Sequence, residues 1–207
     1  FFTSRAQAQI KTAAELVNAI NNGQPNAAVS IGPGTFEISA PLRPKAGMKI
    51  KGAGAGVTII KNVATWAPGN AGLNNDEGAT RSGIQCDSYL FSFPENTKDV
   101  SLSQMTLTGP QMHGAVCGVT PTNLELVHLE FKHFLWSGVR IFIVEGARIH
   151  DNLFVDSGNK SGITTGYDLA NQRKISKKGI KAVSADVEDK SQIAQVAGIS
   201  AADPEIG

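Results

Sequence analysis

One arginine in the second half of the chain lies in a pattern that would present it to a ligand. The aliphatic residues Val139 and Ile141 flank Arg140. Because alternate residues of a β-strand face opposite sides, burial of both aliphatic side chains would turn Arg140 outward on a rigid strand. A planar guanidinium can hold a carboxylate through two parallel hydrogen bonds, so Arg140 is a candidate for binding an acidic ligand. The alternative is a surface arginine that only keeps the protein soluble.

A second group of polar candidates lies a few residues earlier. Burial of Phe131 would leave Glu130 and Lys132 outward, and His133 follows directly. Side chains of these types can exchange protons with a substrate or neutralise its charge. Lys132 and His133 could reach a ligand of Arg140 only if the chain bends them toward the same sheet. We name Arg140, Lys132 and His133 as the catalytic candidates.

Other residues are candidates for holding a ligand. Trp136 could stack on a sugar ring or merely plug the end of a coil, and His150 lies at an expected turn. Together with Glu130 they form the substrate-binding candidates. Asp76 and Glu77 lie in a long polar stretch at 63–88 and offer hard oxygen ligands, so calcium is a possible cofactor there. The stretch lacks the spaced EF-hand pattern and could equally be a solvated loop.

The chain that must position these residues repeats at a nearly constant interval. Three apolar segments follow one another at offsets of 24 and 23 residues: 100–107, 124–131 and 147–154. A second register steps by close to the same interval: 90–93, 115–118, 138–141 and 162–164. Two registers with one period mean that each repeat contributes at least two short strands.

A repeat of this length favours stacked parallel coils. It is too short for a βαβ unit, which needs roughly 30 residues, and the repeats lack the Asn-Gly or Asp-Gly turns of hairpins. Stacked coils bury a continuous column of inward side chains. Asn152 lies where a coil must turn and could bond to the backbone of the next coil. We therefore predict an all-β solenoid, a right-handed parallel β-helix from about residue 27 to 165.

The open end of such a solenoid needs a cap, because it exposes strand edges and apolar core. Residues 12–22 predict one amphipathic helix directly before the first expected strand. Thr12 and Glu15 form a capping box at its start, and Gly23 provides the stop. This helix is the expected cap of the solenoid.

Several segments carry a resemblance to a known group. Pro-Gly-Thr-Phe-Glu-Ile at 33–38 and Met-Lys-Ile-Lys-Gly-Ala-Gly at 48–54 resemble the opening of right-handed parallel β-helix proteins of the pectate-lyase-like group. Gly-Val-Arg-Ile at 138–141 and Ile-His-Asp-Asn-Leu-Phe at 149–154 look like the coil repeat of that group. The resemblance covers about residues 12–165. It is specific for the fold and weak for function, because this fold hosts many chemistries.

The resemblance implies an exported carbohydrate-active protein, a lyase or hydrolase that acts on acidic polysaccharide. Lyases of that group use a basic residue to remove the proton beside a uronate carboxylate, often with calcium to neutralise the carboxylate. The paired Asp-Asp with a downstream Gly-His-Gly and the Trp-x-Asp-His motif of the group's enzymes are absent, and only about five coils fit. The alternative is a non-catalytic β-helix module: a polysaccharide-binding domain, an adhesin or part of a fibre.

Composition and the N-terminal segment indicate the size of the domain, the partners that are excluded and the location of the protein. The chain has 207 residues with a hydrophobic fraction of 41%, enough for the core of one good-sized domain. A formal charge of +1 argues against a dedicated nucleic-acid partner, and no apolar stretch is long enough to span a membrane. Within residues 1–11, Phe1-Phe2 and Ala6-x-Ala8 resemble the remnant of a signal peptide, which indicates a secreted or extracytoplasmic protein.

The C-terminal tail and the two cysteines leave questions open. Residues 166–207 lose the coil pattern, and the spacing at 191–198 predicts a helix. Residues 187–207 are similar to a stretch of group I chaperonins, but the rest of that protein is missing, so neither ATP binding nor foldase activity is implied. Cys86 and Cys117 could pair between neighbouring coils, although a free buried thiol at Cys117 is the favoured interpretation.

Overall fold

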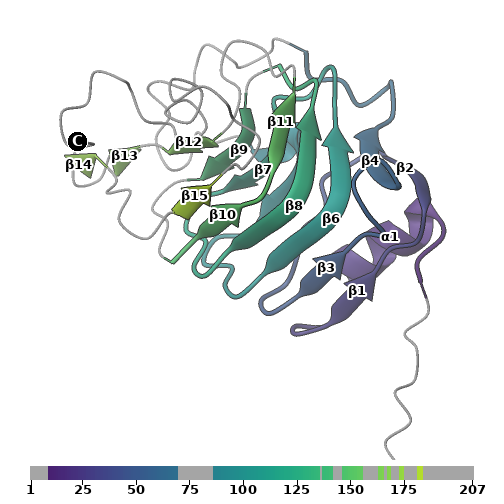
Figure 1. Cartoon of the computed structure of the whole chain (residues 1–207), viewed down its shortest axis with the longest axis horizontal. Helices are drawn as coiled ribbons and strands as arrows, with labels where there is room; N and C mark the ends of the chain where they lie inside the picture. Colours follow the sequence, from purple (N-terminus) through teal and green to yellow (C-terminus); the bar gives the residue numbers. More distant parts are fainter. Residues whose placement is uncertain are drawn as a thin grey trace, which may run out of the picture.

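A computed structural model of the chain describes residues 9–69, 86–135, 137–141 and 146–155, and beyond these only the backbone of the short strands at 163–165, 167–168, 173–174 and 181–183. Most described residues belong to parallel strands that stack as a solenoid (Figure 1). The solenoid has about 4 turns, against the five or so coils that the sequence predicts. The prediction of a parallel β-helix is confirmed.

The helix predicted near the N-terminus is present as α1 (Ala13–Asn21). Thr12 is its N-cap, and the capping box with Glu15 is formed in both directions. Leu16 and Ile20 are fully buried on the face that packs against the first strands. This side-chain packing seals the first turn of the stack, as the sequence predicts for a cap.

The long sheet runs along the whole stack. Its strands lie side by side in this order: β1 (Ala28–Ser30), β3 (Lys49–Lys51), β6 (Ser101–Thr108), β8 (Glu125–Lys132), β10 (Arg148–His150) and β15 (Lys181–Val183). The second halves of β6 and β8 bend into a further row that also contains β2 (Gly34–Ile38), β4 (Thr58–Asn62) and β11 (Leu153–Val155). Every pairing in this sheet is parallel.

A shorter parallel sheet forms another side of the coils. Its order is β12 (Ile163–Thr165), β9 (Ser137–Ile141), β7 (Gly114–Gly118) and β5 (Tyr89–Phe93). The 3₁₀ turn η3 (Cys86–Ser88) leads into β5, and β13 (Tyr167–Asp168) pairs with β14 (Arg173–Lys174) outside both sheets. These strands match the second register of the sequence repeat.

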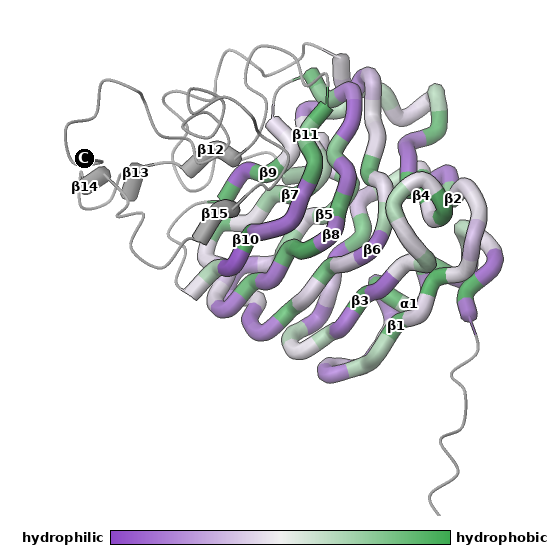
Figure 2. Tube along the Cα trace, in the orientation of Figure 1, coloured by the Kyte–Doolittle hydropathy of each residue, from purple (hydrophilic) through white to green (hydrophobic). Residues whose placement is uncertain are grey.

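The core lies between the two sheets, where equivalent inward side chains stack from one turn to the next. Leu102 pairs in register with Leu126, and Leu126 with Ile149, and all three are at most 1% exposed. Phe131 and Phe154 stack with ring centroids 4.6 Å apart. Hydrophilic residues alternate with these apolar ones along the long sheet (Figure 2). The alternation explains why the repeat was readable in the sequence.

Each turn of the stack bends at corner residues with left-handed backbone. One column of corners precedes β1, β3, β6, β8 and β10 by two residues, and φ is positive at every member: Asn26, Gly47, Asp99, Asn123 and Gly146. A Cβ on Gly146 would lie 2.4 Å from Asn123 Oδ1, so a larger residue there would displace the Asn123 side chain. A second column, at Gln104, His128 and Asp151, bends the chain between the two rows of the long sheet.

The second column is followed by the asparagine singled out in the sequence. Asn152 is 2% exposed and bonds to the adjacent coil, the one that precedes it. Its Oδ1 accepts from the Leu129 N–H over 2.9 Å, and its Nδ2 donates to the Leu126 carbonyl over 2.9 Å. A bond between coils is therefore present, but it runs to the preceding coil, whereas the sequence predicts one to the next coil.

Candidate functional site

Three sequence candidates come together at the end of β8. Lys132 Nζ lies 2.6 Å from Glu130 Oε1, and His133 follows at the end of the strand. Thr106 on β6 pairs in register with Glu130 and donates its hydroxyl to Glu130 Oε2 over 2.7 Å. The Thr106 hydroxyl in turn accepts from the Gly56 N–H over 2.8 Å. The Glu130 carboxylate is thus held by two donors.

This arrangement fixes the charge of Glu130. Burial raises its pKa, but the hydrogen bonds from Lys132 and Thr106 and the positive charges of Lys132 and His133 outweigh burial, so the pKa is lowered overall. An ionised, paired carboxylate whose side chain is only 13% exposed is a poor proton donor. The geometry therefore favours a structural or ligand-holding role for this cluster over acid catalysis.

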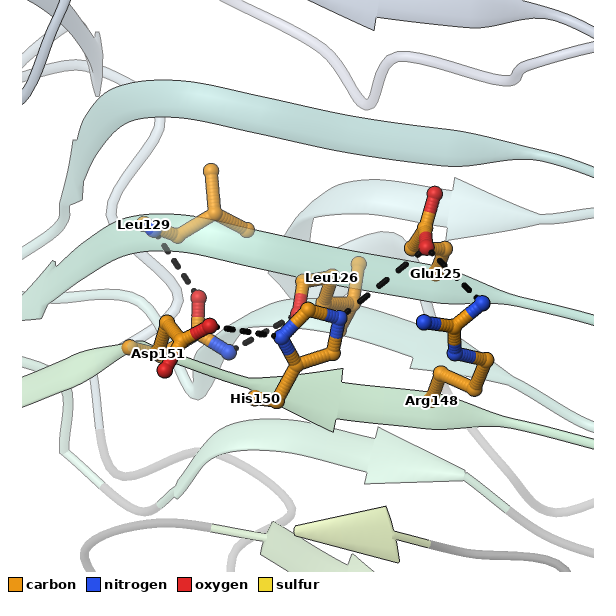
Figure 3. A network of polar contacts seen from close by, with 7 residues as sticks. Glu125, Leu126, Leu129, Arg148, His150 and Asp151 are labelled. Carbon is orange, nitrogen blue, oxygen red and sulfur yellow. Dashed lines mark hydrogen bonds and ion pairs between the residues drawn. The ribbon is translucent and has the colours of Figure 1, made fainter. Parts of the chain in front are cut away.

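His150 belongs to a separate cluster with Glu125, Arg148 and Asp151 (Figure 3). It ends β10 instead of lying in the turn, and Asp151 forms the corner. His150 Nδ1 lies 2.8 Å from Asp151 Oδ2, and His150 Nε2 lies 3.9 Å from Glu125 Oε1. Arg148 Nη1 approaches the same Glu125 oxygen at 3.6 Å. The cluster gathers two acids around one histidine on a partly exposed face.

The structure corrects the orientation expected of Arg140. Arg140 is only 1% exposed, so it is not a surface residue. Every residue of β5, β7 and β9 is buried, and hence both faces of this sheet are covered. Alternation predicts an exposed residue only where one face of a sheet meets water. Arg140 also lies in the other sheet from Lys132, and the three catalytic candidates do not converge.

The cysteines form a disulfide, and the expectation of a free thiol at Cys117 is wrong. Cys86 in η3 bonds to Cys117 in β7, with their Cα atoms 5.3 Å apart. In-register pairing places Ser92, Cys117 and Arg140 on one face of the sheet. The bridge therefore fastens η3 onto the face that Arg140 shares. Two cysteines 31 residues apart carry no spacing signal that would have shown this.

Several predicted site residues and segments lie outside the described residues. They are Trp136, Asp76, Glu77, the N-terminal segment 1–8 and the tail segment 187–207. Within the described ranges, no group of three or more His, Cys, Asp or Glu side chains could hold a metal ion. No helix in those ranges is long and apolar enough to cross a membrane.

The sequence interpretation overlooked a polar face on the long sheet. Ile50, Leu102, Leu126 and Ile149 point into the core, so the residues on either side of them point outward. The outward side chains of β3, β6, β8 and β10 form what we call the lysine–arginine face: Lys49, Lys51, Ser101, Ser103, Glu125, Val127, Arg148 and His150. The alternation of Lys49-Ile50-Lys51 and Arg148-Ile149-His150 was the available signal.

The lysine–arginine face carries accessible positive charge. Lys49, Lys51 and Arg148 are exposed, whereas Glu125 is partly buried. Lys49 Nζ donates to the Asp99 backbone carbonyl, an uncharged partner, over 2.9 Å. The Lys51 ammonium has no hydrogen-bond or ion-pair partner among the described residues. The adjoining row differs, since Lys61 and Lys132 are both paired with glutamates, at 2.7 and 2.6 Å.

Comparisons with models of protein families, with curated proteins and with solved structures find no match to this chain.

Proposed function

We propose that the protein is an exported β-helix module that binds acidic polysaccharide on the lysine–arginine face. The observation that carries the proposal is the placement of Lys49, Lys51 and Arg148, three exposed cations on outward positions of one parallel sheet. Parallel strands hold these positions in straight columns whose successive members are about 4.8 Å apart. A linear polymer with repeated carboxylates complements such a face in both shape and charge.

The chemistry between the cations supports a sugar ligand. Ser101 and Ser103 lie between Lys49–Lys51 and the strands that carry Glu125 and Arg148. Hydroxyl and carboxylate groups on a rigid sheet can exchange hydrogen bonds with sugar hydroxyls. The formal charge of +1 is unlike the broad basic excess of nucleic-acid binders.

The disulfide supports export. Disulfides persist in oxidising compartments and are rare where thiols are kept reduced. The bond between Cys86 and Cys117 therefore fits the secreted or extracytoplasmic location that the N-terminal pattern suggests. The resemblance to pectate-lyase-like proteins points to the same location and to the same class of ligand.

Binding, rather than catalysis, is the function that the geometry favours. Arg140 is buried, Glu130 is ionised and paired, and Lys132 is engaged with Glu130. None of these three is both exposed and free to take a proton from a polymer. His133 is exposed, but it follows β8 and therefore lies away from the sheet that carries Arg140. We therefore propose binding alone, and the test below includes a measurement that would detect lyase activity.

The test measures binding of the full chain to polygalacturonate, hyaluronate and neutral dextran by isothermal titration calorimetry. We expect binding to an acidic polymer but not to dextran, and at least a tenfold loss for the double variant Lys49→Gln and Lys51→Gln, which is about 1.4 kcal/mol. Lys11→Gln with Lys61→Gln removes the same charge elsewhere and should change affinity less than twofold.

Three results would overturn the proposal. They are equal binding to dextran, equal losses in the two double variants, and equally tight binding of single-stranded DNA, which would mean plain charge attraction. The same samples are monitored for the absorbance of unsaturated sugar ends. A steady rise in that absorbance would identify a lyase and replace the binding module with an enzyme.

A further inference from the structure

His150, on the lysine–arginine face, lies between two carboxylates (Figure 3). Its Nδ1 lies 2.8 Å from Asp151 Oδ2, at the corner of its own turn, and its Nε2 lies 3.9 Å from Glu125 Oε1 on β8. Because an ionised carboxylate only accepts hydrogen bonds, the neutral imidazole must carry its proton on Nδ1 to bond to Asp151. The other nitrogen, Nε2, then turns a lone pair toward a second acceptor.

The surroundings of Nε2 do not suit the neutral ring. The atom is buried and has no hydrogen-bond partner among the residues that the structure describes. A buried acceptor that faces another acceptor costs free energy. A second proton on the ring would make Nε2 a donor and a cation opposite Glu125. The geometry around His150 therefore favours the doubly protonated imidazolium.

Charged and titratable residues occupy positions around His150 on its own strand and on both neighbouring strands. They are Arg148 and Asp151 from its own turn, Glu125 and the corner residue His128 from β8, and Lys181 from β15, in register with Arg148. The residues in register with His150 itself, Val127 and Val183, are apolar. Within the contacts of Figure 3, one arginine faces two carboxylates while His150 is neutral, and the charges balance once His150 is protonated.

His150 and Arg148 share one carboxylate oxygen. Arg148 Nη1 approaches Glu125 Oε1 at 3.6 Å, close to the 3.9 Å of His150 Nε2. While His150 is neutral, the Glu125 charge attracts Arg148 alone of the two. Once His150 is protonated it competes for Glu125, and the Arg148 guanidinium, whose side chain is 63% exposed, can turn to a ligand carboxylate. Histidine is the side chain that ordinarily changes its charge between pH 5 and 8.

We infer that His150 is a pH switch of the lysine–arginine face: its protonation engages Glu125, frees Arg148 for the ligand and so strengthens the binding of acidic polysaccharide at mildly acidic pH. This rests on the proposed function, since it assigns the regulation of the same face. Proton and ligand then favour the same state of the face. By linkage, binding of the polymer must in turn promote the uptake of a proton.

The test repeats the calorimetric titration with polygalacturonate at about pH 5.5 and about pH 8, at constant ionic strength. Carboxylic acids ordinarily titrate near pH 4, so the polymer stays charged at both values. We expect the parent to bind at least threefold more tightly at the lower pH, and His150→Gln to bind equally, within twofold, at both. Titrations at about pH 6.5 in two buffers of different ionisation enthalpy should show proton uptake by the parent and none by His150→Gln.

Two further variants separate the switch from a general effect of charge. His128→Gln is the matched control, because it removes another exposed histidine and because Gln104 occupies the equivalent corner one turn earlier. It should keep the full gain of the parent at low pH. Arg148→Gln should lose the gain, because the guanidinium that the switch releases is missing. Circular dichroism checks the fold of every variant, and His150→Asn replaces His150→Gln if the latter does not fold.

Three results would overturn the switch. They are a parent whose affinity is the same at both pH values, a gain in the His150 variant equal to that of the parent, and an undiminished gain in Arg148→Gln. In each case, binding that is weakened in the Lys49 and Lys51 variants would still support the binding face. Absence of binding at both pH values would instead overturn the proposed function and the switch with it, so the two failures are distinguishable.

Discussion

Asn152 offers the sharpest test of how the turns hold one another. The substitution Asn152→Ala removes both side-chain bonds to the preceding turn, to the Leu129 N–H and the Leu126 carbonyl, two partners labelled in Figure 3. Each backbone group left without a partner away from water costs about 1–3 kcal/mol. With Asn152 only 2% exposed, little water can replace the amide.

We therefore expect Asn152→Ala to lower the free energy of unfolding by about 2–6 kcal/mol, measured from urea titrations of circular dichroism. Asn18→Ala removes an amide on the exposed face of α1, whose oxygen accepts from Asn22, and should cost less than about 0.5 kcal/mol. A loss below about 1 kcal/mol for Asn152→Ala would refute the reasoning, because the inter-turn bonds would then contribute little.

A charged replacement gives the same site a pH readout. Asn152→Asp keeps the acceptor for the Leu129 N–H but places a carboxylate oxygen against the Leu126 carbonyl. Burial and that carbonyl favour the protonated form, so the pKa of the new carboxyl should rise on folding. Its stabilising contribution is then present below the unfolded pKa and is lost as the pH rises through the folded pKa. An Asn152→Asp variant that becomes less stable as the pH falls, relative to the parent, would contradict this account.

Three further predictions follow from the described contacts. Changing both Cys86 and Cys117 to Ser should lower the free energy of unfolding by about 3.7 kcal/mol, because the unfolded chain is no longer closed into a loop by a cross-link between residues 31 apart. A urea titration of the parent with reductant should show the same loss. Arg140→Ala should lower the free energy of unfolding by about 2–4 kcal/mol in a urea titration, because it removes a fully buried side chain. A loss below about 1 kcal/mol would instead indicate that Arg140 is exposed, as the alternation of the sequence predicts. The lowered pKa of Glu130 means that its contribution is present above the unfolded pKa and is lost as the pH falls through the folded pKa. Thermal scans from pH 7 down to about pH 3 should therefore show a smaller acid-induced loss for Glu130→Gln than for the parent, and identical losses would contradict the pairing.

The strands could be predicted from the sequence because inward side chains repeat. The segments expected at 100–107 and 124–131 are β6 (Ser101–Thr108) and β8 (Glu125–Lys132), a shift of one residue. The register of these two strands joins Ser101 to Glu125, which reproduces the offset of 24 in the sequence. A one-residue slip would turn every apolar side chain outward, so burial of one face fixes the register.

The environment of the site was harder to predict, because it depends on contacts between distant segments. The pattern around Arg140 is that of a sheet with one open face, but η3 is fastened over the neighbouring strand by Cys86. The pairing of Glu130 with Lys132 follows from their spacing in β8, whereas the hydroxyl of Thr106 reaches Glu130 from another turn. The sequence predicts the outward cations of the lysine–arginine face within each strand, but only the order of the strands shows that they lie on one continuous face.

The column of left-handed corners also makes each turn a unit that can change length. Gly47 and Asp99 are consecutive corners although they are 52 residues apart in the chain, while the other steps in the column are 21, 24 and 23 residues. The Gly47 N–H still bonds to the Lys98 carbonyl at 2.9 Å, next to the following corner. A long excursion between two corners therefore leaves the alignment of the strands unchanged. Such a scaffold can accept a grafted loop, or a whole additional turn, at one level without disturbing the ligand-facing columns above and below it.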